Sequence, residues 1–92
     1  DATCAVSATG EGEALIRTAF AHEVDAGMRL AGLDLERAVR AALVRLSALD
    51  ASGGCVALGR EGAPVLSFTS AAMWRGWLAA EGDPRVALLP EA

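Results

Sequence analysis

The sequence from Ala5 to Arg17, Ala-Val-Ser-Ala-Thr-Gly-Glu-Gly-Glu-Ala-Leu-Ile-Arg, predicts a strand, a tight turn and the start of a helix. The turn is expected over Thr9-Gly10-Glu11-Gly12, where two glycines allow positive φ and a close approach to the backbone. The helix that follows begins with unpaired N–H groups that carry partial positive charge. This corner therefore suits a carboxylate, or an oxygen that becomes negative during a reaction.

The same stretch also fits a purely structural role. Most glycine-rich turns between a strand and a helix only change the direction of the chain. Glu11 and Glu13 agree with that role as well, because acidic residues stabilise a first helical turn by about 0.3–1 kcal/mol. The residues of the corner by themselves do not decide between the two roles.

The composition limits the class of protein. The 92 residues suit one small domain, yet the 53% hydrophobic content exceeds what so small a domain buries by itself. A net charge of −4, from 12 acidic residues against 8 arginines, argues against a nucleic-acid partner. There is no signal peptide and no apolar run of membrane-spanning length. The chain does not begin with methionine and starts inside a strand pattern, so we expect it to be a piece of a longer polypeptide.

Two amphipathic helices are expected between the first and second strands. After a first strand over residues 1–8, a helix is predicted over 12–31, and Gly32 suits the position just past its C-terminus. Its apolar stripe comprises Leu15, Ile16, Ala19, Phe20, Val24, Met28 and Ala31. A second helix is predicted to run to about residue 48, with Asp34 as N-cap and a Glu36–Arg40 pair on its surface.

The second half of the chain predicts antiparallel strands. A hairpin is expected from strands over residues 55–58 and 64–68, with Pro64 at the start of the returning strand. Residues 69–82 are expected to be irregular, and a last strand is expected over 85–89. The order predicts an α+β fold with two helices over an antiparallel sheet. Because the strands are apolar on both faces, a second sheet is expected to cover the other face.

Several polar and aromatic residues are candidates for a site. Cys4 and Cys55 are expected to be buried, reduced thiols, and two cysteines are too few for a zinc site or a disulfide scaffold. His22 falls on the polar side of its helix, which favours a solvated side chain. The segment 73–77, Met-Trp-Arg-Gly-Trp, fits a stacking surface for a ligand. The same segment is better explained by two tryptophans that cover a sheet edge, with a solvated Arg75 between them.

Five blocks of sequence occur in the order found in one known family. They are Val-Ser-Ala-Thr-Gly-Glu-Gly-Glu from residue 6, Gly-Leu-Asp-Leu-Glu-Arg-Ala from 32, Gly-Gly-Cys-Val-Ala-Leu from 53, Phe-Thr-Ser from 68 and Met-Trp-Arg-Gly from 73. Together they resemble the plant-type (type 2) asparaginase and isoaspartyl peptidase family, whose members are N-terminal-nucleophile hydrolases. The resemblance covers nearly all 92 residues and matches the C-terminal part of the β subunit. The Thr-Gly-x-Gly-Glu block is the most specific part.

The resemblance implies a fold, an assembly and a chemistry. Family members are cut by autoproteolysis into α and β subunits, which form an αββα four-layer sandwich and an (αβ)2 heterotetramer. Residues 1–92 would then be one partial domain that needs the α subunit and the remaining β-subunit residues as partners. The resemblance implies no cofactor, metal, nucleic acid or membrane, and a cytoplasmic protein is expected.

The chemistry implied by the resemblance is hydrolysis of the asparagine side-chain amide or of β-aspartyl peptide bonds. The nucleophile is the N-terminal threonine of the β subunit, which lies upstream of this chain, and its α-amine serves as general base. No catalytic nucleophile is therefore expected in this chain. Thr9 and Gly10 match the oxyanion site, through the Thr9 hydroxyl and the Gly10 N–H, and Glu11 and Gly12 line the substrate beside them.

Other assignments stay open from the sequence. Within the superfamily these are glycosylasparaginase and a taspase-like threonine endopeptidase, although the Met-Trp-Arg-Gly block favours the plant-type group. Thr3 could become an N-terminal nucleophile only if the chain were trimmed. A non-catalytic relative that acts as an interaction module is a further class. Where many relatives have Phe-Asn-Thr, this chain has Phe68-Thr69-Ser70, which leaves the preferred substrate open.

Overall fold

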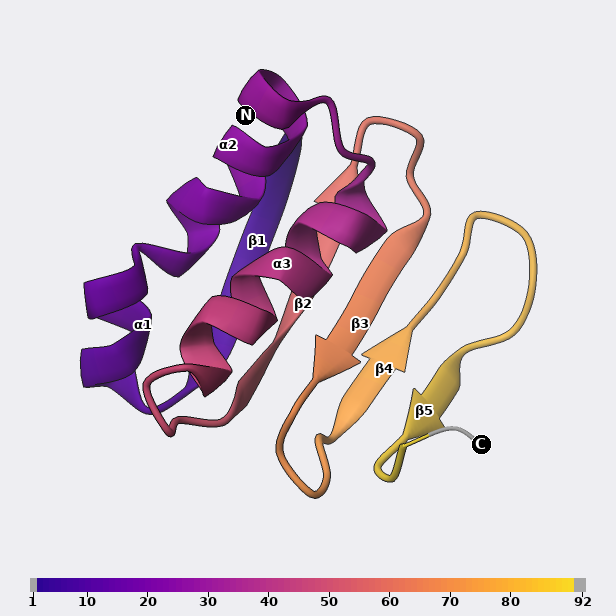
Figure 1. Ribbon diagram of the computed structural model, residues 1–92. Coiled ribbons are helices and arrows are strands. Elements are labelled where there is room, and N and C mark those ends of the chain that lie inside the picture. Colours follow the sequence, from indigo (N-terminus) through magenta and orange to yellow (C-terminus); the bar gives the residue numbers. More distant parts are fainter. Residues whose placement is uncertain (1, 91–92) are drawn as a thin grey trace.

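Three helices lie on one face of a three-stranded antiparallel sheet, and a short hairpin lies beyond the third strand (Figure 1). The computed structural model describes residues 2–90. The main sheet has the order β1 (Cys4–Gly10), β2 (Gly53–Gly59) and β3 (Pro64–Phe68). The helices that connect β1 to β2 are α1 (Gly12–Thr18), α2 (Phe20–Ala31) and α3 (Leu35–Ser47). The predicted α+β class is confirmed.

The predicted β2–β3 hairpin is confirmed, although β2 runs from Gly53 to Gly59 and is longer than the expected strand over residues 55–58. The two strands are antiparallel, and Leu58 lies opposite Pro64, which is the first residue of β3. Proline has no N–H to donate to the hydrogen-bond ladder of a sheet. It is tolerated here because it is the first residue of the strand. Strand β1 begins at Cys4 and continues to Gly10, two residues further than expected, and Asp1 of the expected strand lies outside the described residues.

The core lies between the helices and one face of the sheet. Cys55 and Ala57 of β2 are buried against the helices, where Leu46 and Val39 of α3 and Val24 of α2 are also buried. The neighbouring residues of β2 point the other way because side chains alternate along a strand. On that other face Val56 is 44% exposed and Leu58 is 46% exposed. Within residues 2–90, the sheet therefore has one covered face and one apolar face open to solvent.

The first predicted helix is broken, and this corrects the expectation of one helix over residues 12–31. Ala19 has φ 48° and ψ 53°, a left-handed conformation that ends α1 and begins α2. The hydroxyl of buried Thr18 donates to the carbonyl of Ala14 at 2.9 Å and to that of Leu15 at 3.2 Å. A side chain that bonds to the preceding turn competes with the helix ladder. Ile16 of α1 is 81% exposed, so the expected apolar stripe does not hold at this residue.

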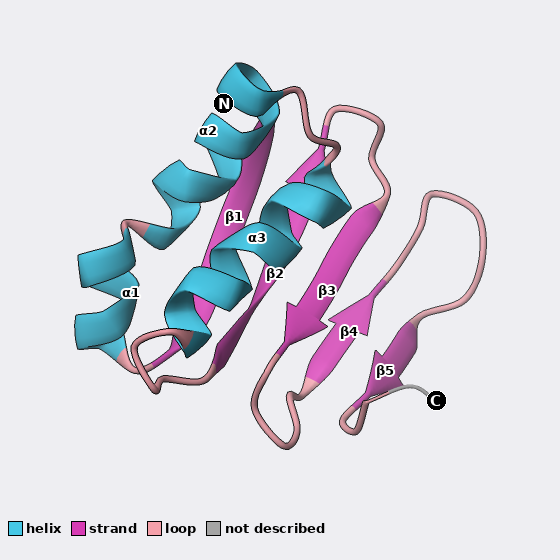
Figure 2. Ribbon diagram, viewed as in Figure 1, coloured by secondary structure: helices cyan, strands magenta, loops and turns pink. Residues whose placement is uncertain are grey.

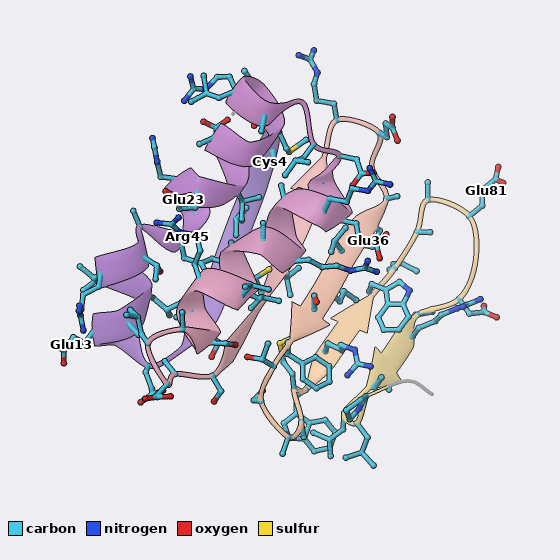
Figure 3. All side chains as sticks on the ribbon, in the orientation of Figure 1. Cys4, Glu13, Glu23, Glu36, Arg45 and Glu81 are labelled. Atoms are coloured by element: carbon cyan, nitrogen blue, oxygen red, sulfur yellow. The ribbon has the colours of Figure 1, made fainter. Side chains whose placement is uncertain are left out.

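The ends of α2 and α3 follow the sequence signals. Gly32 has φ 70° at the end of α2, and the Asp34 carboxylate accepts a 2.8 Å hydrogen bond from the N–H of Arg37. Figure 3 shows Glu23 of α2 and Arg45 of α3 side by side, and their charged atoms are 3.7 Å apart. The predicted cap positions of both helices are confirmed, and a surface ion pair joins the helices.

The C-terminal region contains an unpredicted strand. β4 (Arg75–Trp77) pairs antiparallel with β5 (Arg85–Ala87) in a separate two-stranded sheet (Figure 2). The predicted last strand is confirmed in position but ends at Ala87. Three residues are too few to show the two-residue alternation that marks a half-buried strand, so β4 left no recognisable pattern. Among the helices of residues 2–90, none is long and apolar enough to cross a membrane.

Candidate active site

The end of β1 carries the two residues that the sequence marked most strongly. Thr9 and Gly10 belong to the strand, where they lie opposite Gly54 and Gly53 of β2. This corrects the expected four-residue turn, since only Glu11 separates β1 from α1. Antiparallel pairing with the glycine pair of β2 extends the strand through the position where the turn was expected.

Thr9 points toward the open face of the sheet. Cys4 and Val6 of the same strand pack against the core, and side chains alternate along a strand, so Thr9 lies on the opposite face. Its hydroxyl forms no hydrogen bond with any other residue between 2 and 90. The Thr9 side chain is thus exposed with its hydrogen-bonding capacity unused in this part of the protein.

Gly10 and Gly53 allow a backbone approach that no other residue would permit. Gly10 has φ 141°, and a Cβ atom there would lie 2.7 Å from the carbonyl oxygen of Ser52. A Cβ on Gly53 would lie 2.6 Å from the carbonyl oxygen of Thr9. Real Cβ contacts are not so short, so both positions require glycine, and the two strand ends are held rigidly together.

Glu11 and Gly12 have different surroundings from Thr9 and Gly10. The Glu11 carboxylate accepts a 3.2 Å hydrogen bond from the N–H of Ser52, which ties the corner to the loop before β2. A Cβ on Gly12 would meet no atom within 4 Å, so its backbone is not closely packed. The helix that begins at Gly12 has only seven residues. Its N-terminus adds less to an anion site than the sequence suggested, because a short helix has few aligned peptide dipoles.

A depression of about 450 Å³ gathers three of the four predicted site residues. Thr9, Gly10 and Glu11 line it, and Gly12 does not. The rest of the lining comes from the loop before β2 and the loop after β3, and comprises Ser52, Gly53, Ser70, Ala72, Met73 and Trp74. The lining carries one carboxylate and no basic side chain. A substrate carboxylate in this depression would therefore need its positive partner from outside the lining residues.

Sequence reasoning missed the serines of this lining. Ser52 precedes the glycine pair of β2 and carries no local signal of a site. Ser70 belongs to the Phe-Thr-Ser block of the resemblance, but it is not among the predicted site residues. Trp74, a candidate for ligand stacking, lines the depression and is 79% exposed. The approach of the glycine pair to Thr9 brings Ser52 to the site, and only the strand pairing could have indicated it.

The loop that follows β3 is fastened to the start of β2 through Thr69. The N–H of Thr69 donates to the carbonyl of Gly53 at 2.7 Å, and the N–H of Gly53 donates to the Thr69 hydroxyl oxygen at 3.2 Å. The hydroxyl also lies 3.3 Å from the Gly53 carbonyl oxygen, to which it donates. Further along the loop the N–H of Met73 donates to the carbonyl of Leu88 at 2.8 Å. The second wall of the depression is therefore anchored at both ends.

Arg75 is buried, which corrects the expectation of a solvated side chain. It is 8% exposed, and its guanidinium lies 4.9 Å from the centre of the Phe68 ring. It donates to the carbonyls of Met73 at 3.2 Å and Leu89 at 2.9 Å. Pairing of β4 with β5 turns this side chain inward, where carbonyl oxygens and an aromatic face replace water. The cation thus stabilises the C-terminal region rather than lining the Thr9 depression.

The remaining candidates behave differently from one another. His22 is exposed, as expected. Cys55 is buried, as expected, whereas Cys4 is only half-buried, which corrects the expectation for that side chain. Burial raises the pKa of the Cys55 thiol to about 11. The Thr3 hydroxyl donates a 2.6 Å hydrogen bond to the Asp25 carboxylate. This hydrogen bond, and a second one from Arg29, lower the pKa of the Asp25 carboxyl. No group of three or more metal-ligating side chains occurs within residues 2–90.

Comparison with known proteins gives the family. A family model described as asparaginase matches residues 1–88 of the 92. The chain belongs to the asparaginase family. It is 40% identical over 92 residues to the isoaspartyl peptidase of Salmonella typhimurium and 38% identical over 92 residues to that of Escherichia coli. It is also 38% identical over 85 residues to a probable isoaspartyl peptidase/L-asparaginase 2 of Arabidopsis thaliana.

This asparaginase-family chain spans less than a third of its curated relatives. The two bacterial matches cover 99% of the chain and 29% of each relative, and the plant match covers 92% of the chain and 26% of the relative. Similarity therefore runs through both walls of the depression, from the end of β1 to the loop after β3. The family resemblance noted in the sequence is confirmed.

Proposed function

We propose that the protein containing this chain hydrolyses β-aspartyl peptide bonds, the side-chain amide of asparagine, or both. Membership of the asparaginase family supports this reaction class. The relatives named isoaspartyl peptidase and L-asparaginase favour it over glycosylasparaginase and over a taspase-like endopeptidase. A non-catalytic interaction module has no specific observation in its favour.

The proposed nucleophile is a threonine outside this chain. Its hydroxyl oxygen attacks the amide carbon while its own α-amine takes the proton, and the carbonyl electron pair moves onto oxygen. Collapse of the tetrahedral intermediate breaks the C–N bond, and the leaving amine takes the proton from the ammonium group. Water then attacks the acyl-enzyme ester and gives a proton to the free α-amine. The ester C–O bond breaks, the threonine oxygen takes that proton back, and the aspartyl product leaves. Both additions, first of the threonine hydroxyl and then of water, develop negative charge on the same oxygen, and the collapse that follows each addition removes it.

Thr9 and Gly10 are proposed to stabilise that oxygen. One observation carries this role: the Thr9 hydroxyl is unbonded within residues 2–90 and lines the depression beside the tightly packed Gly10. A donor held in place before the reaction costs no reorganisation when the charge forms. Glu11 and Gly12 are proposed to shape the substrate side, with Glu11 acting through its hydrogen bond to Ser52.

The assembly proposed for the intact protein follows from the open sheet face. The exposed side chains of Val56 and Leu58 on that face favour a second sheet packed there, in an αββα four-layer sandwich. Residues 1–92 then form one partial domain. The α subunit and the other β-subunit residues are the proposed partners, within an (αβ)2 assembly in the cytoplasm.

The test is a substrate panel on the intact purified protein. We expect release of aspartate from a β-aspartyl dipeptide or from asparagine, and little reaction with glycosylated asparagine. Mass spectrometry of the same sample is expected to find two subunits, with threonine as the first residue of one. A matured protein that hydrolyses neither substrate would overturn the proposal.

A further inference from the structure

We infer that Thr69 is a positioning residue for the reaction, because it fixes the loop wall of the depression against the strand wall that carries Thr9 and Gly10. This inference rests on the proposed function. Thr69 does not line the depression itself, so any effect on catalysis passes through Gly53.

The first step of the coupling runs from Thr69 to Gly53. Both backbone groups of Gly53 bond to Thr69, its carbonyl to the N–H at 2.7 Å and its N–H to the hydroxyl oxygen at 3.2 Å. The hydroxyl also donates to the same carbonyl at 3.3 Å. One side chain thus reinforces the backbone contact, and a hydroxyl that both accepts and donates here fixes its own rotamer.

The second step runs from Gly53 to the proposed oxyanion donors. Gly53 lies opposite Gly10 in the ladder, and its Cα would be 2.9 Å from a Cβ on Gly10. On the other side, a Cβ on Gly53 would be 2.6 Å from the Thr9 carbonyl oxygen. There is no room for a side chain at either glycine, so the two backbones pair directly, and we expect a displacement of Gly53 to displace Thr9 and Gly10 as well.

The third step is the loop wall. Thr69 is the first residue after β3, and Ser70, Met73 and Trp74 of the following loop line the depression. Met73 also packs on the open face at Gly54, where an added Cβ would lie 2.7 Å from its sulfur atom. Loss of the Thr69 hydroxyl would leave the backbone N–H bond to Gly53 as the remaining link at this end of the wall, so we expect the wall to be positioned less tightly there.

The experiment compares Thr69→Val with Thr69→Ser in the intact, matured protein. Valine keeps the branched shape and the backbone N–H bond but removes both hydroxyl hydrogen bonds. We expect kcat for a β-aspartyl dipeptide to fall about tenfold, the equivalent of one hydrogen bond of about 1.4 kcal/mol. We expect KM to change by less than about threefold, because the donors act mainly on the transition state. Serine keeps the hydroxyl and is expected to retain kcat within about threefold.

A matched control and a double mutant separate positioning from stability. Thr18→Val also removes a hydroxyl bonded to backbone carbonyls, yet Thr18 lies in α1 away from the depression. It is expected to lower Tm without changing kcat. In a Thr9→Ala background, Thr69→Val is expected to cost less than in the wild type, because one of the two donors that it positions is already absent.

The outcomes distinguish this inference from the function on which it rests. Wild-type hydrolysis together with an unchanged kcat in Thr69→Val would overturn the positioning role alone. If Thr69→Val does not fold, a tenfold loss in well-folded Thr69→Ser would overturn it equally. A wild-type protein without hydrolytic activity would overturn both.

Discussion

At the scale of single residues, Gly10 and Gly12 are only two positions apart in the sequence, but only Gly10 lies where a side chain would clash. Gly10 combines φ 141° with a Cβ position 2.7 Å from a carbonyl oxygen, whereas Gly12 has open space around it. A shared motif therefore contains one glycine required by the backbone and one that is not.

Gly10→Ala is expected to lower the free energy of unfolding, by about 1–3 kcal/mol from the backbone conformation alone and further from the clash. Gly12→Ala is the matched control. It is expected to leave stability unchanged or to raise it by up to about 1 kcal/mol, since alanine favours a helix. Thermal unfolding of the intact protein measures both, and equal stabilities for the two variants would contradict the packing described at Gly10.

The two cysteines are expected to differ in reactivity. The register places Cys4 opposite Gly59 and Cys55 opposite Ala8, so the four residue steps from 4 to 8 separate the cysteines by about 13 Å along the sheet. That separation is too large for a disulfide. Alkylation at pH 8 followed by peptide mapping is expected to modify half-buried Cys4 first and Cys55 only after unfolding. Rapid labelling of Cys55 in the folded protein would show that its burial is wrong.

The raised pKa of Cys55 also predicts a dependence of stability on pH. Its thiol has a pKa of about 11 in the folded chain against 9.0 as the ordinary value. The folded state therefore holds the proton more tightly, and its contribution to stability is complete below about pH 9 and is lost as the pH rises toward about 11. Denaturant unfolding at pH 8, 9 and 10 is expected to show a decline that Cys55→Ala lacks.

At the scale of elements, the break between α1 and α2 is the feature that sequence patterns did not reveal. The helical spacing of apolar residues continues through residues 12–31 and gives no sign of a break. In the structure, the Thr18 hydroxyl donates hydrogen bonds to carbonyls of the preceding turn, and Ala19 adopts a left-handed conformation. Alanine in that conformation costs about 1–2 kcal/mol relative to the right-handed helix.

Ala19→Gly is accordingly expected to stabilise the protein by about 0.5–1 kcal/mol, after the extra freedom of glycine in the unfolded chain is subtracted. Ala21→Gly, two residues into α2, is expected to destabilise it by about 0.5–1 kcal/mol. Differential scanning calorimetry compares the two Tm values with wild type. A lower Tm for Ala19→Gly would contradict the left-handed conformation at residue 19.

Other elements show why sequence reasoning succeeded in some places and failed in others. Asp34, Gly32 and Pro64 act on their own backbone, so their local signals predicted two helix ends and a strand start correctly. The inward turn of Arg75 and the approach of Ser52 to Thr9 depend on strand pairing between distant segments. Such pairing leaves no local pattern, so the place of Ser52 in the lining and the burial of Arg75 could not be predicted.

At the scale of the whole molecule, the open sheet face predicts how residues 1–92 behave without the rest of the protein. Val56 and Leu58 would remain exposed on an apolar sheet, so we expect the isolated piece to aggregate or to be poorly folded. Circular dichroism and size-exclusion chromatography measure this. The double variant Val56→Thr/Leu58→Thr is expected to increase solubility of the isolated piece. A wild-type piece that is monomeric and melts cooperatively would contradict the need for a covering sheet.

The whole protein's activity depends on the Thr9 hydroxyl in the proposed mechanism, and Thr9→Ala tests this most directly. The variant keeps Gly10 and the strand pairing, and Thr9 is exposed, so folding should change little. Thr9→Ser keeps the hydroxyl and is the matched control. Subunit cleavage is checked on a gel, because the same donor also suits autoproteolysis.

The measurement is steady-state hydrolysis of a β-aspartyl dipeptide and of asparagine by the fully matured variants. We predict a fall in kcat of about 10²–10³ for Thr9→Ala, the range found when one oxyanion donor is removed, and a much smaller fall for Thr9→Ser. A matured Thr9→Ala protein with kcat within about twofold of wild type would contradict the oxyanion role and leave the Gly-rich corner a structural feature.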